Sequence, residues 1–220
     1  KEMGLDPEMD TDAKQYFRIK HRAFMEKCTA ILKKHHPDAT IFFNGTVGQY
    51  SPEYHEFDSQ YEMENLPTAW GGYDTLPLRA KYFSHMGKPV VGMTGKFHRD
   101  WGEFGGFKHP NALIYETGLS LACGACISIG DQLHPLGCFE PATYRLIGAA
   151  YAEIEKREQW CHDVTAITDV AIFTTYQGRG EDLPDVGANR ILLEGKYLFN
   201  VIDAEADLGG YKVIILPDDE

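Results

Sequence analysis

Apolar residues recur at near-helical spacing over residues 12–36, a pattern that predicts one long amphipathic helix. The segment ends in two lysines and two histidines, which suit the negative end of a helix dipole, and Pro37 follows as a stop signal. The next short apolar run, residues 39–43, ends at an Asn-Gly turn signal. We therefore expect it to be a fully buried strand of a parallel sheet.

From residue 39 onward, short apolar runs alternate with longer helical segments. We expect further strands at 61–64, 89–94 and 126–130, and helices at 75–87, 109–123 and 141–158. This alternation of strands and helices predicts a parallel sheet with helical crossovers. The links after the strands are long and rich in His, Trp, Asp, Glu and Gly. This asymmetry favours a (β/α)8 barrel, in which such links build the active site, over a doubly wound sheet.

The pattern changes after Trp160. The residues that follow predict one βαβ-like unit. It consists of a strand at 170–174, a polar loop at 177–186, a helix at 188–200 and a strand at 211–216. We predict an α/β chain in two parts: the C-terminal half of a TIM (β/α)8 barrel at 1–163, and the start of a second α/β domain at 164–220. Both ends look cut, so we expect a fragment that is poorly soluble or inactive alone, because half a barrel leaves an open sheet edge.

Composition and charge exclude several classes of protein. The formal net charge of −12 leaves no basic footprint for a nucleic-acid partner, and it disfavours anionic membranes. No apolar run is long enough to span a bilayer, and there is no secretory signal. Five cysteines form no even disulfide framework, which points to a cytoplasmic setting. The CxxC of Cys123 and Cys126 lacks the second pair that a zinc site needs, so we expect inert thiols, no metal and no cofactor.

Two carboxylates share one side of the first predicted barrel strand after residue 60. Glu62 and Glu64 are two residues apart, so on a strand they point the same way. Buried carboxylates are costly unless they are solvated, paired or used. They are candidates for a general acid/base or a sugar-hydroxyl acceptor, and the alternative is a structural ion pair with Arg79 or Lys96.

The loop after the next predicted strand mixes aromatic and charged side chains. His98, Trp101 and Glu103 lie among glycines in this loop. An aromatic face can stack on a pyranose while charged and amide groups bond its hydroxyls, which is the mixture that a sugar site needs. The alternative is a lid loop whose aromatic residues plug the barrel mouth.

A third cluster follows the strand predicted at 126–130. Asp131, Gln132 and His134 come directly after it, at the end where barrel loops carry chemistry. Asp131 and His134 are candidates to contact substrate or to orient a catalytic carboxylate, but an Asp at such a place can equally cap a turn.

Several long motifs together resemble one family of barrel hydrolases. They are Phe42–Gly45, Glu62–Pro67 with Trp70–Tyr73, Gly95–His98 with Trp101–Gly106, and Ser128–Pro135. Over about residues 1–216 the chain resembles the α-L-fucosidases of glycoside hydrolase family one hundred and fifty-one, which are often described as beta-galactosidase trimerisation-domain proteins.

The resemblance implies a barrel followed by a flavodoxin-like trimerisation domain, a carbohydrate substrate and a homotrimer of the full-length protein. It also implies retaining hydrolysis of a terminal sugar by two carboxyl groups. No residue here matches the family's nucleophile, an Asp at the end of the fourth strand. Glu64 is our candidate acid/base, followed by Glu62 and Glu103, and the candidate sugar contacts are Trp70, His98, Trp101, Asp131 and His134. A beta-galactosidase and an inactive carbohydrate-binding or assembly protein remain alternatives. A nucleotide-binding module is disfavoured, because the loop 176–182 carries two carboxylates.

Overall fold

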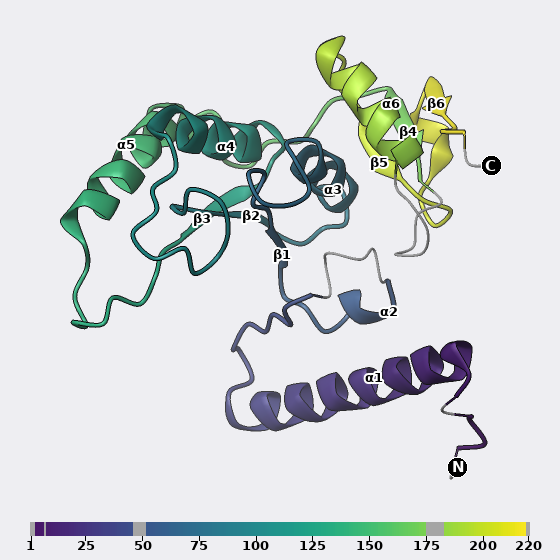
Figure 1. Cartoon of the computed structure of the whole chain (residues 1–220). Coiled ribbons are helices and arrows are strands. Elements are labelled where there is room, and N and C mark those ends of the chain that lie inside the picture. Colours follow the sequence, from purple (N-terminus) through teal and green to yellow (C-terminus); the bar gives the residue numbers. More distant parts are fainter. Residues whose placement is uncertain (1–2, 7, 46–51, 175–182, 219–220) are drawn as a thin grey trace.

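A computed structural model describes residues 3–6, 8–45, 52–174 and 183–218 (Figure 1). The chain is α/β, and its strands form two separate three-stranded parallel sheets. In chain order, the elements are α1 (Asp10–His35), α2 (Pro52–His55), β1 (Tyr61–Glu64), α3 (Thr75–Phe83), β2 (Val90–Gly95), α4 (Pro110–Ala122), β3 (Cys126–Gly130), α5 (Pro141–Glu158), β4 (Val170–Phe173), α6 (Leu183–Glu194), β5 (Asn200–Ile202), the 3-10 turn η1 (Leu208–Gly210) and β6 (Val213–Ile215).

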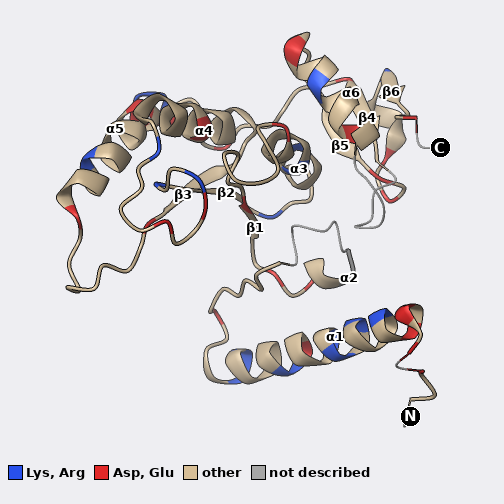
Figure 2. Cartoon of the chain, viewed as in Figure 1, with Lys and Arg blue, Asp and Glu red and all other residues tan. Residues whose placement is uncertain are grey.

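The first helix matches the predicted long amphipathic helix. It carries two aspartates in its first turn and basic residues in its last turn, so both ends complement the helix dipole (Figure 2). Lys33 Nζ donates to the carbonyl oxygens of Pro37 and Ala39 at 2.9 and 2.8 Å, which holds the chain as it leaves the helix. Phe24 packs edge-on against Phe43, so α1 contacts the segment that follows it.

The prediction of a buried strand at 39–43 is wrong. These residues run beside the start of β1, but side chains take the hydrogen bonds that a neighbouring strand would make. The Ile41 amide donates to Ser59 Oγ and the Phe43 amide donates to Asp58 Oδ1, both at 2.9 Å. Because Asp and Ser side chains compete in this way with backbone ladders, the run stays irregular and half-buried.

The first sheet has the strand order β1-β2-β3. Its register aligns Glu64 with Met93, and Met93 with Ser128. A Cβ added at Gly92 would meet Leu76 of α3 and Ser120 of α4, so both helices cover the same face of the sheet. Helix α5 packs on α4, and Figure 1 shows both above the strands. Sequential strands with their helices on one face are what a barrel segment requires.

A polar cluster is buried between this sheet and α4. Lys108 Nζ lies 2.6 Å from Glu116 Oε2, and both side chains are almost fully buried. Thr94 and Tyr73 donate their hydroxyls to the same carboxylate. Burial, followed by the negative charge of Glu116, raises the pKa of Tyr73. The cluster lies on the helix side of the sheet, so its role is to join β2 to α4.

The second sheet has the order β5-β4-β6. Residues 159–169 form no helix or strand and lead into β4. The predicted helix 188–200 is misplaced, because α6 ends at Glu194 and the chain turns through Gly195 and Lys196, which has a positive φ of 58°. That turn frees Asn200–Ile202 to form β5, a strand that the sequence pattern did not reveal. Most of the predicted polar loop 177–186, and the loop 176–182, lie outside the described residues.

The two parts share one hydrophobic core through α3. Tyr82 and Phe83 belong to the same buried cluster as Phe199 and Val201 of the second part. Lys81 Nζ lies 4.4 Å from the Phe199 ring centroid and donates to the Phe199 carbonyl oxygen at 3.3 Å. Burial lowers the pKa of Lys81 and raises the pKa of the neighbouring Cys123 thiol. Two further polar links cross the junction: the Tyr82 hydroxyl donates to Asp203, and Arg190 forms an ion pair with Asp74.

Candidate active site

The carboxylates of β1 lie on the face of the sheet opposite the helices. Tyr61 and Met63 are buried under α3, and the alternate residues Glu62 and Glu64 are only partly buried on the other face. Glu64 Oε1 accepts a hydrogen bond from Asn44 Nδ2 at 3.4 Å. Within the described residues neither glutamate forms an ion pair, so the alternative of a structural salt bridge has no support there.

Trp101 lies over the same face, on a floor made by two glycines. A Cβ built on Gly130 would lie 2.4 Å from Trp101 Cζ3, and one built on Gly95 would lie 3.0 Å from it. Real side chains essentially never approach as closely as the first of these distances, so the indole can occupy this place only while Gly130 lacks a side chain, and Gly95 leaves little more room. Phe97 meets the indole edge-on, with ring centroids 5.6 Å apart. Trp101 Nε1 is buried without a hydrogen-bond partner among the described residues.

Lys96 and Gln132 hold the loops around Trp101. Lys96 is fully buried directly after β2, and its Nζ donates to Gln132 Oε1 at 3.0 Å and to the Gly106 carbonyl oxygen at 3.1 Å. Gln132 Oε1 also accepts from the Gly105 amide at 3.3 Å. Both residues lie in motifs that the sequence analysis identified, but neither was predicted as a site residue. The reason is that nothing in the sequence indicates that a Lys or a Gln is buried.

Glu103 is tied to its own loop. Its Oε2 accepts from the Arg99 amide at 2.7 Å, and its side chain curls so closely over Gly106 that a Cβ there would collide with it. A carboxylate used in this way closes the loop, so it is less available to a substrate than the carboxylates of β1.

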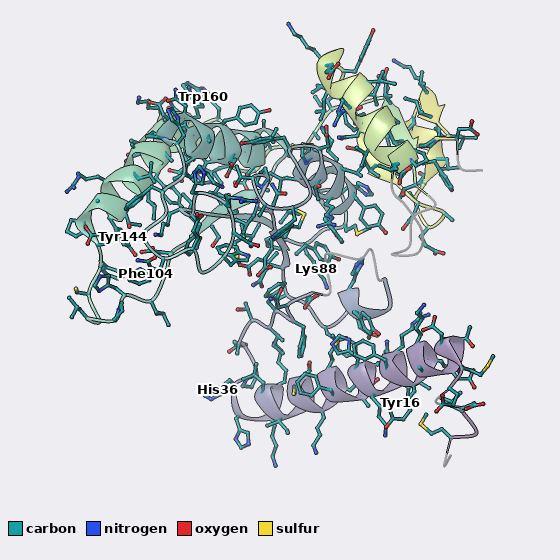
Figure 3. The ribbon with its side chains drawn as sticks, viewed as in Figure 1. Tyr16, His36, Lys88, Phe104, Tyr144 and Trp160 are labelled. Carbon is teal, nitrogen blue, oxygen red and sulfur yellow. The ribbon has the colours of Figure 1, made fainter. Side chains whose placement is uncertain are left out.

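In the third cluster, Asp131 caps a turn, whereas His134 lies beside an exposed aromatic ring. Asp131 Oδ1 accepts from the Gln132 amide at 2.7 Å, as expected of an Asp at a turn. His134 Nδ1 accepts from the Leu136 amide at 3.2 Å, and its ring lies 6.0 Å from the exposed ring of Phe104. Phe104 is labelled in Figure 3 on the side of the molecule near the start of α5.

The remaining predicted sugar contacts lie on two loops that touch. Trp70 is half-buried in a turn after β1, where its amide donates to the Leu66 carbonyl oxygen at 2.9 Å. His98 is exposed in the loop after β2. Thr68 Oγ1 donates to the Arg99 carbonyl oxygen at 3.2 Å, which joins the two loops. The three loops after β1, β2 and β3 are therefore linked at the carboxyl ends of these strands. The predicted site residues lie on β1 or on these loops.

The described residues contain no cluster of His, Cys, Asp and Glu that could hold a metal ion. Cys123 is buried and Cys126 is exposed, and both are free thiols. No helix in the described part of the chain is long and apolar enough to cross a bilayer.

Comparison with known proteins gives one informative likeness. No family model matches the sequence, and no curated protein matches it. Among solved structures, the chain is similar to alpha-L-fucosidase isoenzyme 2 from Paenibacillus thiaminolyticus, at 45% sequence identity and a TM-score of 0.93. The likeness covers 98% of this chain and 34% of that one, so the chain spans about a third of the fucosidase. It confirms the predicted resemblance to an α-L-fucosidase.

Proposed function

We propose that this chain forms the acid/base and sugar-binding part of a glycosidase, an α-L-fucosidase acting on a terminal sugar. The observation that carries the proposal is the close match to a fucosidase over 98% of the chain, which includes the strands and loops of the candidate site. The partly buried carboxylates of β1 and the indole of Trp101 on the same face supply the two kinds of group that such a site needs.

Glu64 is the proposed general acid/base. It lies nearer than Glu62 to the carboxyl end of β1, where the loops of a barrel carry chemistry, and in the described residues its carboxylate accepts only the long hydrogen bond from Asn44. A carboxylic acid there would protonate the leaving oxygen and then, as carboxylate, activate water. Glu62 is second, and Glu103 is third because its loop already uses its carboxylate. Trp70, His98, Trp101, Asp131 and His134 are the proposed sugar contacts.

The larger architecture belongs to the same proposal. Residues 1–163 are the C-terminal half of a (β/α)8 barrel, supported by the order β1-β2-β3 with α3 and α4 on one face. Residues 164–220 begin a flavodoxin-like trimerisation domain, supported by the order β5-β4-β6, in which the first strand lies between the second and third. Family one hundred and fifty-one, a homotrimer and a retaining mechanism with its nucleophile on an earlier strand complete the proposal.

The test compares hydrolysis of an aryl α-L-fucoside by the intact wild-type protein and its Glu64→Gln variant. Gln keeps the size of the side chain but cannot donate a proton as an acid, so we expect kcat/KM to fall by about 10²–10⁴-fold. Glu103→Gln is the matched control, and we expect a smaller loss because its carboxylate closes a loop.

Each outcome of this assay decides a different part of the proposal. Cleavage of an aryl β-D-galactoside in place of the fucoside would show that the proposed sugar is wrong, while the proposal of a glycosidase would stand. If neither substrate reacted, a binding or assembly protein would replace the enzyme. A Glu64→Gln variant with wild-type kcat/KM would remove Glu64 from the chemistry.

A further inference from the structure

Lys96 is a buried cation without a buried anion beside it. Its side chain is fully buried, and in the described residues its Nζ has two neutral oxygen partners, Gln132 Oε1 and the Gly106 carbonyl. The rings of Phe97 and Phe107 lie on it, each with its centroid 4.9 Å from Nζ. No described carboxylate lies within ion-pair distance of Lys96, in contrast to Lys108, which pairs with Glu116.

A buried ammonium with neutral partners is expensive for folding. Removing a charge from water costs free energy that two neutral hydrogen bonds and two aromatic faces offset only in part. A methionine would fill nearly the same volume without that cost. The ammonium therefore does something at this place that an apolar side chain cannot do, and its contacts show what that is.

The contacts of Lys96 tie the loop that carries Trp101 to β3 and to the loop after it. The backbone of Lys96 closes this loop, because its amide donates to the Gly130 carbonyl oxygen at 3.0 Å and its carbonyl accepts from the Lys108 amide at 2.7 Å. Its Nζ holds the far side of the loop at Gly106, and it holds Gln132 of the next loop. Gln132 in turn binds the Gly105 amide.

A second route reaches the indole directly. Phe97 lies under the Lys96 ammonium and also meets Trp101 edge-on. Gly95 and Gly130 form the floor under the indole, and neither has a side chain that could hold the ring in place. Phe97 and the backbone of the loop are therefore left to position it.

We propose that Lys96 is a positioning residue that, through Gln132 and Phe97, fixes the Trp101 indole as the platform on which the pyranose ring of the substrate stacks. This inference rests on the proposed function, and it names the group that sets sugar affinity in that site. Lys96 is buried and does not touch the sugar. Its loss lets the loop shift, and a shift of about 1 Å in a binding group is enough to cost up to a hundredfold in rate.

The experiment uses Lys96→Met, Gln132→Leu and Gln132→Glu in the intact protein. Inhibition of fucoside hydrolysis by free L-fucose gives Ki, which reports occupation of the sugar site, and KM and kcat are measured beside it. Acrylamide quenching of tryptophan fluorescence reports exposure of the indole without any need for activity, and Trp101→Phe identifies the contribution of Trp101 to that signal.

We expect Lys96→Met and Gln132→Leu each to raise Ki and KM by about tenfold or more and to make Trp101 more accessible to acrylamide, since the platform is displaced. Gln132→Glu keeps the acceptor oxygen for Lys96 and Gly105, so it should restore Ki and quenching to near the wild-type values. The double variant Lys96→Met/Gln132→Leu should be little worse than either single variant, because both act on one clamp.

Lys88→Met is the matched control. Lys88 also donates to two carbonyl oxygens, those of His55 and Asp58, and lies 5.4 Å from an aromatic ring centroid, but it lies at the opposite end of β1 (Figure 3). Its loss should lower stability and leave Ki and Trp101 quenching unchanged.

The outcomes separate this inference from the proposed function. A wild-type protein that cleaves no fucoside would end the proposed function, and the quenching data alone would then decide whether Lys96 positions Trp101. A wild-type protein that does cleave it, with unchanged Ki and quenching in Lys96→Met, would overturn the inference. The inference would also fail if Lys88→Met raised Ki as much as Lys96→Met, since the effect would then be one of general stability.

Discussion

At the scale of single residues, alternation along short strands decides which side chains can reach a substrate. Tyr61 and Met63 fill the core under α3, so Glu62 and Glu64 face the other way. The same rule places Gly92 under the helices, and Gly95, three residues on, under Trp101. Such parity follows from the sequence once the strand is located, and this is why the β1 carboxylates could be identified in advance.

A glycine substitution tests the floor under Trp101. Gly130→Ala puts a methyl carbon 2.4 Å from the present position of Trp101 Cζ3, so the indole must move. We expect the free energy of unfolding to fall by about 1–3 kcal/mol, as for other overpacked sites, and KM for a fucoside to rise. Urea denaturation and steady-state kinetics measure the two effects.

Gly118→Ala is the control for that substitution. Gly118 lies inside α4 with open space where a Cβ would lie, and alanine there should stabilise the helix by about 0.5–1 kcal/mol without changing KM. Equal kinetics for Gly130→Ala and the wild type would show that Trp101 can leave its floor without consequence.

At the scale of elements, the match between prediction and structure depends on what competes for backbone hydrogen bonds. The helices at α1 and α5 and the strands at β1 and β3 have the predicted positions, because their periodicity is long or their flanks are clear turn signals. The run 39–43 failed as a strand because Asp58 and Ser59, fifteen or more residues away, capture its amides. Strand β5 has three residues and follows an exposed Tyr197-Leu198 pair, so its pattern merged with that of α6.

The buried pair between β2 and α4 gives a prediction at this scale. Lys108→Met leaves the Glu116 carboxylate buried with only the hydroxyls of Thr94 and Tyr73 as partners. We expect a loss of about 3–5 kcal/mol in the free energy of unfolding, measured in urea, because the charge is uncompensated.

Two comparisons check the cause. The double variant Lys108→Met/Glu116→Leu removes both charges and should recover most of the loss. Lys14→Met breaks the exposed pair with Asp10 and should cost no more than about 0.5 kcal/mol. A double variant as unstable as Lys108→Met would locate the damage in packing and not in charge.

At the scale of the whole molecule, the two sheets are joined by one core. The sequence predicted a change of register after Trp160, but it could not show that α3 of the first part would pack on Phe199 of the second, because that contact joins residues more than a hundred positions apart. The predicted boundary at 163/164 therefore separates two patterns of strands, while the buried cluster crosses it.

This shared core predicts joint unfolding. Phe199→Ala empties a fully buried site beneath Lys81 and should lower the free energy of unfolding by about 3–5 kcal/mol. All three tryptophans, at 70, 101 and 160, precede the second sheet, so their fluorescence reports the first part alone. We expect the fluorescence transition to move to lower denaturant together with the far-UV circular dichroism transition. A fluorescence transition that stayed in place would mean that the parts unfold independently.

The glycines under Trp101 also make the substitutions tolerated at one position depend on the residue at another. While Trp101 lies across Gly95 and Gly130, a side chain at either glycine crowds the indole, and a large aromatic residue at 101 fits best where both glycines are present. Substitutions are therefore tolerated best in one order, in which Trp101 is replaced first and the glycines are replaced afterwards. In a randomised library, alanine at 130 should be tolerated together with a small residue at 101 and selected against beside tryptophan. These three positions should thus be inherited as a group, although they are far apart in the chain.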